Sequence, residues 1–399
     1  GRARRAAKAR HLQKLYRANP GVCMMRLLEG NTPPVYCAIA EPELVAHFSA
    51  TFSAPPPLGP PPVWLFSDRH PGDTGGPGTP DEGDILQSPV TPEEVVTQYK
   101  RAKRTTPGID GITYASWRWV DPQGLTLSTI YNICRVNSRV PRPWKHSTVT
   151  LIHKGGDTAT IRNWRPISLQ VTIYKLYSAL IARRIASWAI ATQAFSPAQK
   201  GFLAFDGYAE HNFILRSMMT DARRSKHDLL LTWLDLRDAF GSVPYELLLS
   251  TMKHLGLSGS ILHIVEDIYS QSTVAIRTGK DTYTPAIQQN RGVKQGCPLS
   301  PILFNIALEG LLKHLATNTA GYLLAGYAIN SLAYADDICV VASNRTEIQD
   351  LLNMCHEFAD WAGLVFHAQK CGSLCMVNQA PRIHVDHCFS PLIGTEAIP

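Results

Sequence analysis

Three acidic residues lie next to or within apolar segments, where burying a carboxylate is energetically costly. Asp235 ends the apolar run 229–234, and the adjacent Asp336 and Asp337 interrupt the apolar stretch 332–341. A buried acid needs a cation beside it, and two neighbouring acids repel each other. A bound divalent cation removes both penalties. Mg²⁺ prefers carboxylate oxygens, and two such ions about 3.5–4 Å apart support in-line nucleotidyl transfer. Taken alone, the Asp336-Asp337 pair also fits a plain hairpin turn.

The flanking residues form blocks whose order favours the catalytic interpretation. The blocks are Asn-Trp-Arg-Pro-Ile-Ser-Leu at 163–169, Asp-Leu-Arg-Asp-Ala-Phe at 235–240, Arg-Gly-Val-Lys-Gln-Gly-Cys-Pro-Leu-Ser-Pro at 291–301 and the YxDD box Tyr-Ala-Asp-Asp at 334–337. Together they resemble the fingers and palm of the reverse transcriptase family, over roughly residues 88–378. Pro-Gly-Ile-Asp-Gly at 107–111 and Gln-Lys-Gly-Phe at 199–202, with Gly207 and Glu210, are similar to LINE-type (non-LTR) retrotransposon enzymes. The residues of these blocks are most similar to those of non-LTR elements that carry a restriction-like endonuclease.

The resemblance implies a two-metal active site. Asp235, Asp336 and Asp337 would be the catalytic acids and would hold two Mg²⁺ ions, with Mn²⁺ as a possible substitute. The backbone carbonyl of Leu236 would be a further metal ligand. One ion would lower the pKa of a primer 3′-hydroxyl, and the other would neutralise the leaving pyrophosphate.

The resemblance also implies a dNTP site. Phe240 matches an aromatic position that excludes a ribose hydroxyl, although a core aromatic is the alternative. Lys154 and Arg165 match cations that grip the triphosphate, although each also fits an ordinary surface charge. Lys370 matches a late palm lysine that is sometimes cast as the acid that protonates pyrophosphate. The remaining expected dNTP contacts are Ala239 and Gln295.

The implied partners are an RNA template, a DNA primer or target, and dNTPs. Tyr334, Arg291 and Gly296 are expected to contact primer or template. The resemblance further implies a nuclear location and gives no oligomeric state.

Some features depart from the family pattern. His367 stands where Asn is expected, Tyr245 where His is frequent, and Gly241 where many relatives have Asp. None of these is an expected metal ligand. No thumb, primer grip or endonuclease is found before Pro399, so we expect a fragment of a longer protein.

Charge and composition restrict the class of protein. The 399 residues include 39 Lys and Arg and 32 Asp and Glu, and seven of the basic residues lie without an acid in residues 1–17. This arm fits either a phosphate-binding helix or a solvated helix face. Hydrophobic residues at 45% indicate a folded chain, yet no apolar run approaches the roughly 18 residues of a membrane span. No signal peptide is visible, and nine scattered Cys suit a reducing compartment.

The elements that must position the acids alternate between strands and helices. We expect strands at 148–153 and 228–236, a hairpin over 274–288 and a strand–turn–strand over 332–341. A Thr91–Glu94 capping box predicts a helix to about Lys103, and Gly363 predicts the end of another. The other expected helices are at 169–186, 247–254, 261–269, 301–315 and 346–361.

The missing βαβ repeat predicts an α+β fold. With the resemblance, this becomes the fingers and palm of a right-hand polymerase, with an antiparallel palm sheet and helices packed on one face. The expected domains are a basic helical extension (1–50), a Pro/Gly-rich linker (51–88), the reverse transcriptase fingers (89–228), the palm (229–380) and the start of a truncated C-terminal connection (381–399).

Other interpretations stay open. One is a non-catalytic nucleic-acid-binding remnant of a degraded retroelement, and another is an RNA-directed RNA polymerase. A zinc cluster is also conceivable, but its spacing is loose and favours core or loop residues. Its members would be Cys371, Cys375, His384, His387 and Cys388.

Overall fold

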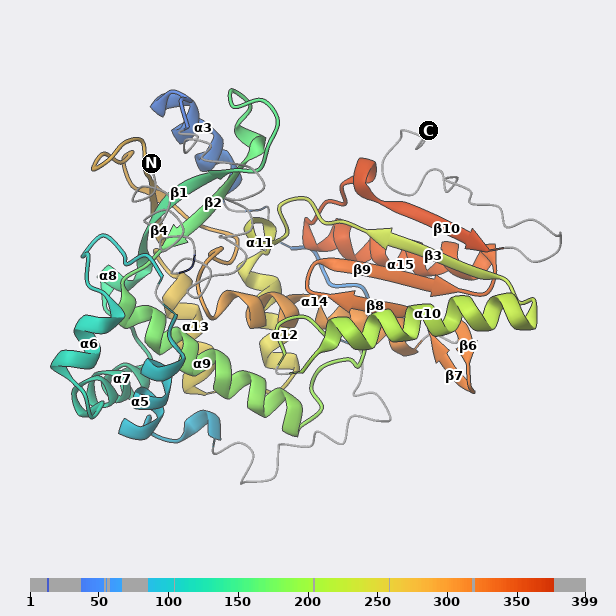
Figure 1. Cartoon of the computed structure of the whole chain (residues 1–399), viewed down its shortest axis with the longest axis horizontal. Helices are drawn as coiled ribbons and strands as arrows, with labels where there is room; N and C mark the ends of the chain where they lie inside the picture. The colour runs from blue at the N-terminus through green and yellow to red at the C-terminus, as the bar shows by residue number, and fades with distance from the viewer. Residues whose placement is uncertain are drawn as a thin grey trace, which may run out of the picture. The chain divides into compact units, whose positions relative to one another are not determined.

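A computed structural model describes Gln13 and residues 37–376, apart from gaps at 54, 56–57, 67–84, 104, 204, 258 and 318–319 (Figure 1). The basic arm apart from Gln13, and the last three members of the possible zinc cluster, lie outside the described residues. The chain divides into two compact units. One includes residues 153–165, and the other includes residues 40–152 and 166–376. Within the described residues, no helix is long and apolar enough to cross a membrane.

An antiparallel sheet carries the predicted acids at one end. Its strand order is β10-β3-β9-β8, and Leu234 of β3 lies opposite Ile338 of β9. The strands are β3 (Leu229–Leu234), β8 (Ser331–Tyr334), β9 (Asp337–Ala342) and β10 (Gly372–Met376). The strands predicted over 228–236 and 332–341 are therefore confirmed, as is the α+β class.

The expectation that helices cover one face of this sheet needs a correction. Helix α15 (Arg345–Ala362) packs on β3 and β9, whereas α10 (Gly207–Ser225) lies across the opposite face (Figure 1). Leu229 and Leu231 of β3 share a core with Met218 of α10. The physical reason is the apolar run of β3, in which only Thr232 is polar, since such a run is typical of a strand whose two faces are both covered.

A second sheet has the order β2-β1-β4-β5. Its strands are β1 (His146–His153), β2 (Trp164–Leu169), β4 (Thr273–Ile276) and β5 (Ile287–Gln288). The β4–β5 pair confirms the predicted hairpin. The parallel pairing of β1 with β4, with His146 opposite Thr273, joins segments from the predicted fingers and palm ranges. A third, two-stranded sheet consists of β6 (Tyr322–Leu324) and β7 (Tyr327–Ile329).

The predicted helices are found with small shifts of their ends. Thr91 Oγ1 accepts a hydrogen bond from the Glu94 N–H and the Glu94 carboxylate accepts one from the Thr91 N–H, which confirms the capping box. Gly363, with φ 62°, ends α15 as predicted. The remaining helices are α3 (Glu41–Thr51), α5 (Pro92–Arg101), α6 (Tyr114–Val120), α7 (Leu125–Asn137), α8 (Arg142–Lys145), α9 (Thr172–Ala191), α11 (Ala239–Ser242), α12 (Tyr245–His254), α13 (Ser260–Tyr269) and α14 (Ser300–Thr317).

Residues 58–66, here called the strap, lie within the predicted linker and contact α14 and α15 through Trp64 and Leu65. Trp64 Nε1 donates to Glu357 of α15 at 3.0 Å, and the Trp64 ring stacks on His314 of α14 with centroids 4.0 Å apart. Leu65 is 4% exposed and lies over Gly310, where an added Cβ would come within 2.5 Å of Leu65 Cδ1. Proline restricts this backbone before folding, and Trp64 and Leu65, which follow Pro62, supply the anchors.

The strap gives a first test of stability. Leu65→Ala is expected to lower the free energy of unfolding by about 2–4 kcal/mol, because it leaves a cavity in a packed site. Val63→Ala is the matched control on the same segment, since Val63 is 91% exposed and its loss should change little. Chemical denaturation of the full-length protein measures both. Equal effects of the two substitutions would show that the strap is not anchored.

Candidate active site

The sheet register brings the three predicted acids together. Leu234 lies opposite Ile338, so the next pair along the two strands is Asp235 and Asp337. Asp336 precedes Asp337 in the tight turn after Tyr334. Burial raises the pKa of Asp336 above its ordinary value, and the nearby carboxylates of Asp337 and Asp235 raise it further. The acids therefore form one electrostatically coupled cluster.

Residues 367–371 hold Asp235 from its other side. The His367 N–H donates to the Asp235 carbonyl at 2.8 Å, and the Asp235 N–H donates to Cys371 Sγ at 3.5 Å. This contact brings Lys370 Nζ to 3.4 Å from Asp235 Oδ2. The predicted late lysine thus lies in the acid cluster. Cys371 and Cys375 are buried, which matches the core interpretation for these two residues.

The donor set fits a hard divalent cation. Carboxylate oxygens are the ligands that Mg²⁺ prefers, and the ion pair with Lys370 balances only one of the clustered negative charges. In the described part of the chain, no three His, Cys, Asp or Glu side chains are already gathered as a metal site.

The segment 198–201 supports the turn that contains Asp336, and sequence reasoning gave it no role. Gln199 forms an isolated parallel bridge with Ala333, beside β8. Its side-chain oxygen accepts hydrogen bonds from the N–H groups of Gly201 and Ala335, each at 2.9 Å. The Gln-Lys-Gly-Phe block was the available signal, but nothing local in it points to a partner so distant in sequence.

Phe240 packs against the core and is partly accessible, and its role at a dNTP site stays a prediction. The Val293 N–H donates to the Phe240 carbonyl at 2.7 Å, which fixes the backbone of α11. The Phe240 ring stacks on Phe304 with centroids 4.9 Å apart and meets Phe202 edge-on at 6.2 Å. The ring is only partly buried, so packing on one side leaves an accessible part. Ala239 is 5% exposed, so its methyl group belongs to the core.

Two residues expected to contact primer or template also have roles in packing, and the nucleic-acid contacts stay predictions. The Arg291 guanidinium donates to the carbonyls of Ser242 and Gly363, which ties α11 to the end of α15. Gly296 has φ +108°, and an added Cβ would come within 2.8 Å of the Ser168 carbonyl oxygen. The Gln295 carbonyl accepts a hydrogen bond from the Ser168 N–H at 2.7 Å. The protein's own packing therefore explains Arg291 and Gly296.

Tyr334 and the two predicted triphosphate cations are accessible. Tyr334 is 42% exposed at the start of the acid turn. Lys154 and Arg165 are exposed on the unit that contains residues 153–165. In that unit the Lys154 N–H donates to the Asn163 carbonyl at 2.8 Å, and the buried Trp164 packs against His153. These contacts close the loop that carries both cations.

Tyr245, which stands where the family pattern frequently has His, has a structural role. Its hydroxyl donates to the Gly292 carbonyl at 3.2 Å and so braces the Gln295 loop, and burial raises its pKa well above the ordinary range.

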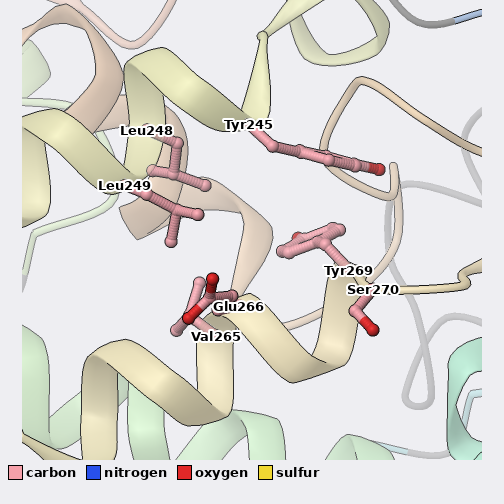
Figure 2. A pocket seen from close by; sticks show the side chains of 7 residues that line it. All are labelled: Tyr245, Leu248, Leu249, Val265, Glu266, Tyr269 and Ser270. Atoms are coloured by element: carbon pink, nitrogen blue, oxygen red, sulfur yellow. The ribbon is translucent and has the colours of Figure 1, made fainter.

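Figure 2 shows Tyr245 and Tyr269 at the edge of a small apolar pocket of about 180 Å³ between α12 and α13. Its lining includes Leu248, Leu249 and Val265, and none of the three clustered acids. This pocket is therefore separate from the acid cluster.

Comparison with known proteins names the class of protein to which this sheet and its acid turn belong. Residues 152–385, more than half of the chain, match the family described as reverse transcriptase (RNA-dependent DNA polymerase). The chain belongs to the reverse transcriptase family.

Two similar proteins come from R2 retrotransposable elements. The chain is 29% identical over 317 residues to the Retrovirus-related Pol polyprotein from type-1 retrotransposable element R2 of Popillia japonica, covering 76% of this chain and 43% of the relative. It is 28% identical over 298 residues to the R2 protein of Nasonia vitripennis, covering 74% of this chain and 28% of the relative. The predicted resemblance to non-LTR retrotransposon enzymes is confirmed. The chain spans less than half the length of these relatives.

A solved structure also aligns with this chain. An apo telomerase from Candida tropicalis, truncated from the C-terminal domain, aligns with a TM-score of 0.45 and 14% identity. The alignment covers 66% of this chain and 62% of that one.

Proposed function

We propose that the protein containing this chain copies RNA into DNA by adding dNMP units to a primer 3′-hydroxyl. The observation that carries the proposal is the convergence of Asp235, Asp336 and Asp337 at one end of an antiparallel sheet, in a chain of the reverse transcriptase family. A structural hairpin does not need three mutually repelling carboxylates, whereas metal-dependent nucleotidyl transfer does.

Each site residue then has a definite task. Asp235, Asp336, Asp337 and the Leu236 carbonyl would hold two Mg²⁺ ions. When bound, these supply Lewis-acid activation of the 3′-hydroxyl and neutralise phosphate charge. Lys370, which pairs with Asp235, would donate a proton to the leaving pyrophosphate. Separately, the accessible edge of Phe240 would exclude a ribose 2′-hydroxyl.

The remaining roles concern the incoming nucleotide and its partners. Lys154 and Arg165 would grip the triphosphate as fixed cations, and Gln295 would touch the nascent base pair. Tyr334 would pack near the primer end. An RNA template and a DNA primer or target are the proposed partners, in the nucleus.

Primer extension by the full-length protein tests the proposal. A DNA primer annealed to an RNA template is expected to be extended to the template end with dNTPs and Mg²⁺, to stop in EDTA, and to resume with Mn²⁺. Resolving the products by length measures the reaction. Tight RNA binding without any Mg²⁺-dependent extension would contradict the proposal and favour the non-catalytic remnant.

A further inference from the structure

We infer that Gln199 is a positioning residue for the acid turn, defined here as Tyr334, Ala335, Asp336 and Asp337. Its side-chain amide holds Ala335 and thereby sets where the Asp336 carboxylate lies. The inference rests on the proposed function, because it concerns how the polymerase acids are kept in register.

One buried side chain satisfies both backbone groups of Ala335. Gln199 is 1% exposed. Its Oε1 accepts from the Ala335 N–H at 2.9 Å, and its Nε2 donates to the Ala335 carbonyl at 3.4 Å. Buried backbone groups without partners are costly, so this amide replaces the partners that the turn itself cannot supply.

Ala335 needs this support because its backbone is strained. Its φ of +57° lies in the left-handed region, which is unfavourable for residues other than glycine. The carboxylates of Asp235, Asp336 and Asp337 also repel one another and favour an opened turn. The hydrogen bonds from Gln199 oppose both tendencies.

Gln199 is itself fixed in place, so it can hold the turn. The Lys200 N–H donates to the Ala333 carbonyl and the Ala333 N–H donates to the Ala198 carbonyl, each at 2.9 Å. On the other side, Asn305 Nδ2 of α14 donates to the Gly201 carbonyl at 2.7 Å. The segment 198–201 is thus anchored to both β8 and α14.

Gly201 shows how close the segment lies to the turn. A Cβ at this position would clash with the backbone nitrogen of Ala335 and would come within 3.0 Å of Gln199 Oε1. Only glycine allows the two backbones to approach this closely. Gly201→Ala therefore disturbs the same contact as loss of the Gln199 amide, by a different route.

The kinetic test uses Gln199→Met in the full-length protein. Met has a similar size and keeps the site filled, but it removes the donor and the acceptor. We expect kcat for primer extension to fall about 10- to 100-fold, as for a small misplacement of a reacting group. The affinity for primer–template should be unchanged, and the Mg²⁺ concentration for half-maximal rate should rise.

Gln98→Met is the matched control. Gln98 is also a buried glutamine, 8% exposed on α5, where its side chain accepts a hydrogen bond from Arg183. This variant removes a buried amide far along the chain from the acid turn, and kcat and Mg²⁺ dependence should stay at the wild-type values. A wild-type kcat in Gln199→Met, or an equal loss in Gln98→Met, would overturn the inference.

Hydrogen exchange provides a readout that does not need activity. In Gln199→Met and in Gly201→Ala, the peptide containing Ala335 should exchange faster, while other peptides of the palm sheet keep their protection. Faster exchange throughout the sheet would mean that Gln199 only stabilises the fold, and would overturn the inference. If wild-type protein does not extend primers, the proposed function fails, yet this comparison still decides whether Gln199 holds the turn.

Discussion

Asp336→Asn is expected to abolish primer extension while the fold remains intact. Loss of a ligand to a catalytic ion removes several kcal/mol of transition-state stabilisation, so the rate should fall by about 10³-fold or more. Asn has nearly the same shape as Asp and keeps one oxygen, so the substitution removes charge without leaving a cavity. Single-turnover extension on an RNA template measures the loss.

The same substitution should leave the folded protein as stable as wild type or more stable. The pKa of Asp336 is raised in the folded state by burial and by Asp337 and Asp235, so its charge opposes folding above that pKa. Stability contributed by such a group is present at low pH and is lost as pH rises through the folded-state pKa. Denaturation at neutral pH should therefore favour the Asn variant, and the difference should vanish in acid.

Asp360→Asn is the control for charge removal. Asp360 is 70% exposed near the end of α15 and lies beside His356, so its charge has no part in the acid cluster. Extension and stability should both stay near wild type. If Asp336→Asn retains undiminished synthesis, the assignment of the metal ligands has to be abandoned.

The local parts of this structure could be predicted because their signals are local. The capping box at Thr91 and the left-handed cap at Gly363 depend on backbone groups within a few residues. The acids could be found for a similar reason, since a carboxylate such as Asp235 after an apolar run conflicts with its own surroundings. Such conflicts are expected at functional sites.

The parts that could not be predicted depend on contacts between distant segments. The parallel pairing of β1 with β4 and the packing of the strap on α14 and α15 leave no periodic signal in either segment. Gln199 is the clearest case in the site. Its partner Ala335 lies 136 positions away, and a glutamine carries no charge or spacing that marks it as buried. Its role becomes visible only when both segments are placed.

The apolar run of β3, with Thr232 as its one polar residue, already indicates a strand that is covered on both faces, which the predicted one-sided sheet did not take into account. Alternation is expected when one face of a strand meets solvent, and β3 has none. Residues 213–219 of α10 are mostly apolar, but no helix is predicted over 207–225, so the cover of the second face is missing from the prediction. Only a few positions of α10 face the sheet, among them Met218 and Ala222.

Phe240→Ala is expected to let the enzyme use ribonucleotides. In the proposed site the ring occupies the space that a ribose 2′-hydroxyl would need, and removing it should raise NTP use relative to dNTP use by about 100-fold, within the range that one misfitting group produces. Competing incorporation of NTPs and dNTPs on the same RNA template measures the ratio. Phe213→Ala is the matched control, because Phe213 is 73% exposed on α10 and should not affect selectivity.

The ratio of NTP use to dNTP use distinguishes a Phe240 ring that excludes the 2′-hydroxyl from a ring that only packs in the core, even if the variant is destabilised. Phe240 stacks on Phe304, so truncation also weakens the core and reduces the amount of folded protein. That loss lowers NTP and dNTP incorporation by the same factor and cancels in their ratio. Unchanged selectivity would therefore identify Phe240 as a core aromatic only. Efficient NTP use by wild type, unaltered by Phe240→Ala, would instead favour an RNA-directed RNA polymerase, because the metal chemistry is the same for both sugars.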